Sequence, residues 1–141
     1  MDKHELQLGN AVQNITNNHN PSQKDWVIKQ LGETKAVVYR VGNTKEQAVF
    51  KYCNLAPIPL SIDMLDKMLF TRQGKRNMWV KDKVCVVLED YPDSRGNSTG
   101  EKFYIGFKDL GNVIYHSQFE CPSVHFLQNA FALCGKQLLI N

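Results

Sequence analysis

The sequence predicts a single α+β domain, residues 1–141, in which about five antiparallel strands form one sheet with helices packed on it. The length fits one ordinary domain. The apolar and charged fractions, 43% and 22%, are those of a globular chain. The hydrophobic pattern also changes several times between the period of a helix and that of a strand. The expected order is α(α)-β-β-α-β-β-β-α, and a small β-barrel with peripheral helices is the competing arrangement.

The first two predicted helices lie near the amino terminus. Four apolar residues of segment 5–16 have the spacing of one helical face: Leu8, Ala11, Val12 and Ile15. An asparagine-rich connection ends at Pro21, and the whole 1–21 segment is a candidate for a peripheral position. Ser22 and Asp25 stand three residues apart directly before an apolar run, as in a capping box. A second helix is therefore predicted from Ser22 to about Leu31.

A β-hairpin is predicted next. Residues 36–41 and 48–52 alternate in the manner of strands, and the first is rich in β-branched side chains. Gly42 opens the turn between them, and the loop is expected to contain four or five residues. Two prolines in the connection 54–59 predict that this stretch has no regular strand pairing.

The middle of the chain predicts one helix and one long strand. Ser61 is the expected N-cap of a helix that ends at Gly74. Residues 78–88 are predicted to form a single strand. The segment 91–100 is rich in polar, turn-forming residues, so it is expected to be an exposed and mobile loop.

The carboxyl-terminal third predicts a second hairpin and a last helix. Residues 103–107 and 113–119 are the two strands, joined by a turn at Gly111-Asn112. Pro122 is expected near the first position of the helix. Its apolar residues follow at steps of three and four: Val124, Leu127, Phe131, Cys134 and Leu138.

The four cysteines and the absence of a long apolar run favour a cytoplasmic protein. The cysteines are far apart and form no C-x-x-C pair, and three of the four have an apolar neighbour. They are predicted to be free thiols in a reducing compartment. No run approaches the roughly 18 apolar residues that a spanning helix needs, so no membrane segment is predicted.

The basic charge is concentrated in one segment. Residues 67–83 contain six bases and one acid, a net charge of +5, and the rest of the chain has a net charge of −2. A local basic patch favours polyanionic partners. The candidate nucleic-acid-binding residues combine cations with one aromatic ring on which a base could stack. They are Arg72, Lys75, Arg76, Trp79, Lys81 and Lys83.

No motif identifies a reaction. The glycines of segment 96–102 are separated by three residues where a P-loop needs four, and a predicted strand follows them where a P-loop needs a helix. Cys121 and His125 could share a helical face, but no second ligand pair has zinc-like spacing. No nucleophile stands in a recognisable catalytic motif. The sequence therefore predicts no catalytic residue, no cofactor and no metal ligand.

These observations favour a non-enzymatic interaction domain, such as an adaptor, an inhibitor or an assembly subunit. Its expected partner is another protein or a second copy of itself. The first alternative is a nucleic-acid-binding protein that uses the basic 67–83 segment. The second is a small-molecule-binding domain, or an enzyme whose site is not recognisable from sequence.

Overall fold

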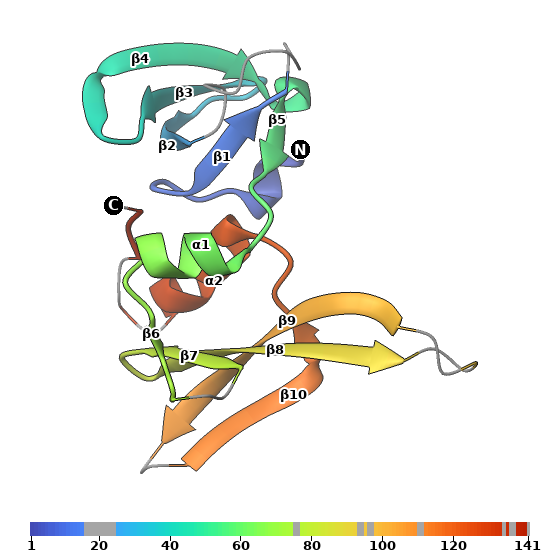
Figure 1. The fold of residues 1–141 in the computed structure, drawn as a ribbon. Helices are drawn as coiled ribbons and strands as arrows, with labels where there is room; N and C mark the ends of the chain where they lie inside the picture. Colours follow the sequence, from blue (N-terminus) through green and yellow to red (C-terminus); the bar gives the residue numbers. More distant parts are fainter. Residues whose placement is uncertain are drawn as a thin grey trace. The chain divides into compact units, whose positions relative to one another are not determined.

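The fold is mostly β, and it corrects the predicted single sheet covered by helices. The computed structural model describes residues 1–15, 25–74, 77–92, 95, 98–109, 112–133, 135 and 138–140. These residues form two five-stranded antiparallel sheets (Figure 1). The α-helices among them are α1 (Ile62–Lys67) and α2 (Val124–Leu133). The helix-rich α+β prediction is therefore wrong.

The chain divides into two compact units, each with its own sheet. Unit 1 contains Met1–Pro59 together with Ser123–Asn141, and unit 2 contains Leu60–Pro122. Unit 1 is thus discontinuous in sequence, because its amino-terminal strands and its carboxyl-terminal helix come from the two ends of the chain described here.

The sheet of unit 1 is a four-stranded meander whose fifth strand returns to the first. Its strand order is β4-β3-β2-β1-β5. The strands are β1 (Ala11–Asn14), β2 (Trp26–Leu31), β3 (Lys35–Arg40), β4 (Asn43–Lys51) and β5 (Leu55–Pro57). Two 3-10 turns complete the amino-terminal part, η1 (Lys3–Glu5) and η3 (Tyr52–Asn54). Within the described residues, β4 and β5 are the two edges, and no pairing between them closes a barrel.

The predicted helix over 5–16 is replaced by η1 and β1. Ala11 and Val12 are both fully buried although they are adjacent in a strand, where side chains alternate between faces. Both faces of β1 are therefore covered, and helix α2 contacts this strand. Leu8 and Ile15, which would complete the helical face, are exposed. In a strand that is buried on both faces, apolar residues can be adjacent in sequence. The adjacent pair Ala11 and Val12 therefore fitted the spacing of a helical face as well.

The predicted helix from Ser22 to about Leu31 is also wrong. Asp25 has a φ of 72°, and Trp26–Leu31 is strand β2. Ser22 lies outside the described residues, so its expected role as a cap is not described. The carbonyl oxygen of Asp25 accepts a hydrogen bond from the Val41 amide at 2.8 Å. The apparent capping-box carboxylate instead belongs to the residue directly before central strand β2.

The first predicted hairpin is confirmed, with a shorter turn. β3 and β4 pair antiparallel, and only Val41 and Gly42 separate them. Gly42 has a φ of 81°, a backbone conformation that glycine adopts without a steric penalty. The expected loop of four or five residues was too long.

The connection 54–59 contains a strand that the sequence analysis excluded. β5 pairs with β1, and Pro57 is the partner of Val12. Proline is tolerated there because β5 is an edge strand and needs hydrogen bonds on one side only.

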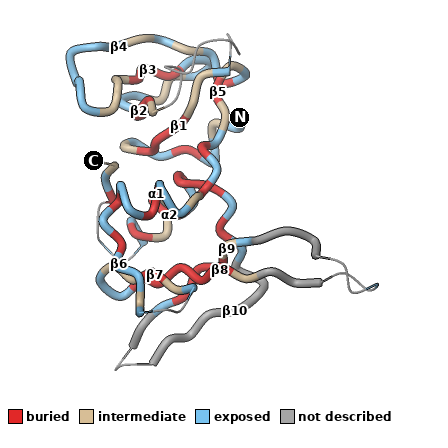
Figure 2. The backbone as a smooth tube through the Cα atoms, in the orientation of Figure 1, coloured by how far each residue is buried: buried red, intermediate tan, exposed pale blue. Residues whose placement is uncertain are grey.

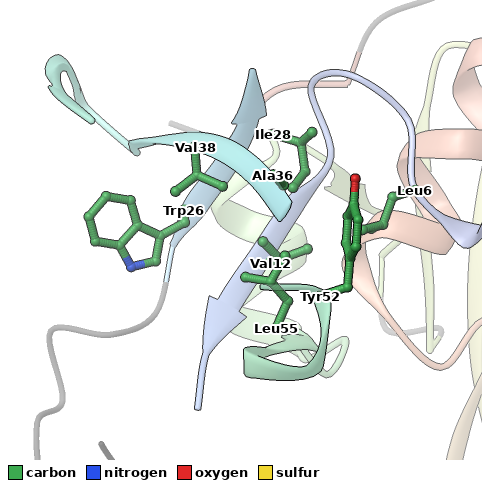
Figure 3. Close-up of a cluster of buried hydrophobic side chains, with 8 residues drawn as sticks. All are labelled: Leu6, Val12, Trp26, Ile28, Ala36, Val38, Tyr52 and Leu55. Carbon is green, nitrogen blue, oxygen red and sulfur yellow. The ribbon is translucent and has the colours of Figure 1, made fainter. Parts of the chain in front are cut away.

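The core of unit 1 lies on the inner face of this sheet. Its buried side chains are Leu6, Val12, Trp26, Ile28, Ala36, Val38, Tyr52 and Leu55 (Figure 3). The Tyr52 hydroxyl donates to the Gly32 carbonyl oxygen at 2.6 Å, which ties the turn after β4 to the turn after β2. Most of β4 is exposed, in contrast to β1–β3 (Figure 2).

Unit 2 is built on the second sheet, with strand order β10-β9-β8-β7-β6. The strands are β6 (Thr71–Arg72), β7 (Met78–Lys81), β8 (Val84–Pro92), β9 (Ser98–Asp109) and β10 (Asn112–Glu120). The hairpin predicted at 103–107 and 113–119 is confirmed as β9 and β10, although Gly111 of its turn lies outside the described residues.

Two other predictions in unit 2 need correction. The single strand expected over 78–88 is a hairpin, because Asp82 has a φ of 53° and reverses the chain between β7 and β8. The loop expected over 91–100 is shorter, since β8 runs to Pro92 and β9 begins at Ser98. Of the residues between them, only Arg95 is described, so the predicted mobility of this loop is not described.

Both described helices begin close to where the sequence predicts. The Ser61 hydroxyl accepts a hydrogen bond from the Met64 amide at 3.2 Å, which confirms the N-cap of α1. This helix ends well before Gly74, because Leu69 has a φ of 65°. In α2 the predicted inward residues are buried, namely Val124, Leu127 and Phe131. Cys134 lies outside the described residues, and Leu138 is buried beyond the end of the helix. In the described part of the chain, no helix combines the length and the apolar character needed to cross a membrane.

Candidate functional site

The predicted basic site divides into residues with different roles. Arg72 is exposed, and its guanidinium lies 5.3 Å from the centre of the Trp79 ring. Its Nη2 also donates to Oδ1 of Asn77 at 3.2 Å. The two residues meet because Arg72 and Trp79 are register partners between β6 and β7. The structure thus brings this predicted pair together.

Trp79 itself belongs to the core of unit 2. Its side chain is only 1% exposed, and its ring packs edge-on against Phe103 with the ring centres 6.4 Å apart. A base needs an accessible ring face for stacking, and Trp79 does not present one to solvent in this structure.

Two of the other predicted cations, Lys81 and Lys83, are described by the structure. Lys81 donates from Nζ to the Met68 carbonyl oxygen at 2.8 Å, a contact that supports the end of α1. Lys83 is exposed in the turn between β7 and β8. Lys75 and Arg76 lie outside the described residues. Their part in the basic site therefore remains a prediction.

A serine, a histidine and a carboxylate meet in unit 1, where the sequence analysis found no site. Oγ of Ser123 lies 3.0 Å from Nδ1 of His125, and Nε2 of His125 lies 3.9 Å from Oε2 of Glu5. Burial lowers the pKa of His125, and the negative charge of Glu5 partly opposes this effect. Ser123 and His125 are both buried. These contacts join the start of α2 to η1.

A second polar cluster fixes α2 on β1. The Gln128 amide accepts from the Ala11 backbone at 2.7 Å and donates to the carbonyl oxygens of Gly9 and Leu138. Asn10 donates to the side chain of Asn129 at 2.8 Å. All of these polar atoms are paired within the protein, so the cluster is a structural connection.

Histidine, cysteine and acidic side chains are the candidates for metal or thiol chemistry. No three histidine, cysteine or acidic side chains among these residues group closely enough to hold a metal ion. Cys85 and Cys121 are buried and Cys53 is exposed, each as a free thiol.

An open hollow of about 490 Å³ lies beside edge strand β4 in unit 1. The described residues that line it are Asn14, Lys35, Val49, Phe50, Lys51 and Asn54. Three of them are consecutive in edge strand β4. Asn14 is on β1, Lys35 is on β3 and Asn54 ends η3, so the hollow lies beside the carboxyl-terminal end of β4 and reaches β1 and β3.

The two lysines of this hollow lie directly opposite each other. Lys35 on β3 and Lys51 on β4 are register partners. Lys35 is positioned by the tight turn before it, where the Gly32 amide donates to the Lys35 carbonyl oxygen at 2.9 Å. A Cβ at position 32 would lie 2.7 Å from that oxygen, so this turn requires glycine. The result is a concentrated positive charge on the outer face of the sheet.

Neither lysine has an acidic partner within the part of the chain that the structure describes. The ion pairs there are Arg40–Glu46, Lys102–Glu120 and Glu5–His125. Like charges placed directly opposite across a strand pair are destabilising. An anion bound near both ammonium groups would offset this repulsion.

No described strand pairs with the outer side of β4 beside the hollow. The Tyr52 amide donates to the Thr34 carbonyl oxygen, which makes these two residues a hydrogen-bonded pair. Such pairs alternate with non-hydrogen-bonded pairs along an antiparallel ladder. The register therefore directs the N–H and C=O groups of Lys51, Val49 and Gln47 away from β3. Within the described residues, β4 pairs with no other strand.

An aromatic pair supports the inner wall of the hollow. The ring of Phe50 packs edge-on against that of Trp26, with centres 5.3 Å apart. The Arg40 guanidinium lies over the Trp26 ring, 5.6 Å from its centre. Nε1 of the buried Trp26 has no hydrogen-bond partner among the described residues. This packing fixes Phe50, so the wall of the hollow is held by the core.

No family model, curated protein or solved structure matches this chain. The predicted strand 48–52 contains Lys51, whereas the predicted strand 36–41 begins one residue after Lys35. The sequence analysis missed the pairing of the two lysines, because that pairing depends on the two-residue turn and on the register that the turn sets.

Proposed function

We propose that this protein is a non-enzymatic interaction module whose unit 1 binds an extended segment of a partner protein along the edge of β4. The observation that carries the proposal is the hollow lined by three consecutive residues of an edge strand, Val49 to Lys51. An extended peptide can add a strand to such an edge through main-chain hydrogen bonds.

The two halves of β4 differ in a way that supports this binding mode. In the first half, Oδ1 of Asn43 accepts from the Lys45 amide, and Nε2 of Gln47 donates to the Thr44 carbonyl oxygen. Side chains therefore occupy backbone groups there, which is one way to protect an edge from unwanted pairing. Near Val49 and Lys51 no such contact occurs among the described residues, and the hollow leaves room for a strand.

The test is a substitution that removes one backbone N–H of β4 pointing away from β3 and keeps the hydrogen bonds between β4 and β3. Val49→Pro deletes an N–H that points away from β3, so the ladder with β3 loses no hydrogen bond. The probe is a fluorescein-labelled eight-residue peptide of alternating valine and threonine, titrated by fluorescence anisotropy. Val49→Pro is expected to weaken binding by up to about tenfold, the effect of losing one well-formed hydrogen bond.

Val49→Thr is the matched control, because it changes the same side chain and keeps the N–H. It is expected to bind the probe nearly as well as the wild-type protein, while circular dichroism shows the same fold for all three proteins. Equal binding by the wild type and Val49→Pro, or no binding by the wild type at millimolar concentration, would contradict edge pairing.

The nucleic-acid alternative depends on the charge of the 67–83 segment rather than on stacking. Lys83 is exposed and Arg72 remains accessible beside its contacts, whereas Trp79 is buried. A surface of this kind would contact the phosphate backbone without reading bases. A single-stranded RNA probe is therefore included in the experiment that follows.

A further inference from the structure

We infer that the hollow beside β4 selects a partner segment that carries an acidic side chain, whose carboxylate binds the ammonium groups of Lys51 and of its cross-strand neighbour Lys35. This inference rests on the proposed function and specifies the chemistry of the partner. Lys35, Lys51 and Asn54 all line this hollow. Together they offer a carboxylate several hydrogen-bond donors, some of them charged.

The position of the acid within the partner segment follows from the strand geometry. Lys51 and Val49 are two residues apart and project from the same face of β4. A strand that pairs antiparallel with β4 places one residue opposite Lys51 and the residue two positions later opposite Val49. Val49 is 59% exposed and apolar, so it favours an apolar partner. The preferred pattern is therefore acidic-x-apolar.

A protein segment fits this site better than a nucleic acid does. The donors and acceptors of the β4 backbone match a second peptide backbone, and they do not match a phosphate chain. The described cations that line the hollow number two and lie side by side. Binding of a nucleic-acid backbone instead uses a groove of positive charge that follows several phosphates.

The experiment titrates a labelled single-stranded RNA and three labelled eight-residue peptides that differ from one another at one position. The peptides carry glutamate, glutamine or lysine two residues before a valine. The wild-type protein is expected to bind the glutamate peptide about tenfold more tightly than the glutamine peptide, as a charge-assisted contact predicts. Lys35→Gln and Lys51→Gln should each remove most of this preference. Lys45→Gln is the matched control, since Lys45 is an exposed lysine of the same strand that does not line the hollow.

The outcomes separate this inference from the proposed function. If the glutamate and glutamine peptides bind equally and Val49→Pro weakens both, edge pairing stands and the acidic preference is overturned. If none of the peptides binds, both proposals fail. If single-stranded RNA binds, the peptides do not, and Lys35→Gln weakens the RNA complex, the hollow is a phosphate site and both proposals are again overturned.

Discussion

His125 is a buried histidine whose contacts connect α2 with η1. Ser123, His125 and Glu5 are the residue types of a hydrolytic triad. However, Ser123 contacts Nδ1 of His125 and its side chain is buried. A catalytic serine must reach a substrate carbonyl. We therefore expect this cluster to contribute to the stability of the fold rather than to catalysis.

The free energy of unfolding is expected to fall as the pH is lowered through the titration of His125. Burial, the largest cause, holds the pKa of His125 below its ordinary value of 6.5, and Glu5 only partly offsets this. The unfolded chain then binds a proton at a higher pH than the folded protein does. The stabilising contribution is complete above about pH 6.5 and is lost as the pH falls from there through the lower pKa of the folded state.

Urea denaturation at several values between about pH 7.5 and about pH 5 measures this effect. His125→Gln cannot titrate, so its unfolding free energy should change less over this range than that of the wild-type protein. His4→Gln is the control, because His4 is exposed and should leave the wild-type profile unchanged. Parallel profiles for His125→Gln and the wild type would contradict the assignment.

Among the elements, the pair formed by α2 and β1 shows why sequence patterns were misleading in unit 1. Ala11 and Val12 are buried on opposite faces because α2 and the inner core cover both sides of β1. In β2, the consecutive residues Trp26, Val27 and Ile28 are buried in the same way. Such strands lose the alternation that identifies a half-exposed strand. The covering helix is about a hundred residues away in sequence, so no local pattern could reveal it.

The elements with one exposed face were predicted well for the same physical reason. Inward Ala36 and Val38 of β3 are buried, whereas outward Val37 is partly exposed, so the alternation survives. In α2 the period of three and four survives because one side of the helix packs and the other does not. The candidate site was predictable only in part. Its strands were predictable, but the register that places Lys35 opposite Lys51 was not.

Gln128 is expected to be the strongest single connection between α2 and β1. Gln128→Ala leaves the Ala11 N–H and the Gly9 and Leu138 carbonyl oxygens without their partner. An unsatisfied buried backbone group costs about 1–3 kcal/mol, so a loss of at least about 2 kcal/mol in the free energy of unfolding is expected. Urea denaturation followed by far-ultraviolet circular dichroism measures it.

Leu133→Ala provides the comparison on the same helix. Leu133 is 89% exposed, so its truncation should change the free energy of unfolding by no more than about 0.5 kcal/mol. If Gln128→Ala were as mild as Leu133→Ala, the helix would be held mainly by its apolar face, and the polar connection would contribute little.

For the whole molecule, the two sheets imply two hydrophobic cores that sequence composition could not separate. Length and composition are properties of the whole chain, and their values are those of one ordinary domain. The division depends on where the chain leaves unit 1 and returns to it. Pro59 and Ser123 mark these points, and they are partners in an isolated antiparallel bridge. The chain therefore leaves and re-enters unit 1 at neighbouring positions.

Unit 1 is accordingly expected to fold when residues 60–122 are replaced by three glycines. Bridge partners in antiparallel pairs have Cα atoms about 4.5–5.5 Å apart, a gap that a linker of this length spans easily. The contacts on both sides of the junction are retained, including the bond from the Val124 amide to the Ile58 carbonyl oxygen at 2.9 Å. Trp26 becomes the only tryptophan, because the other, Trp79, is deleted. Its fluorescence therefore reports on this unit alone.

The joined chain should unfold cooperatively in urea, with the Trp26 emission shifting to longer wavelength as the ring leaves the core. A chain that ends after Pro59 is the control, and it should show no cooperative transition, since β1 then loses Gln128 and the covering face of α2. An unfolded joined chain would show that unit 1 depends on residues 60–122. A cooperative transition in the control would show instead that the strands hold together without the helix, and that the discontinuous unit is not the folding unit.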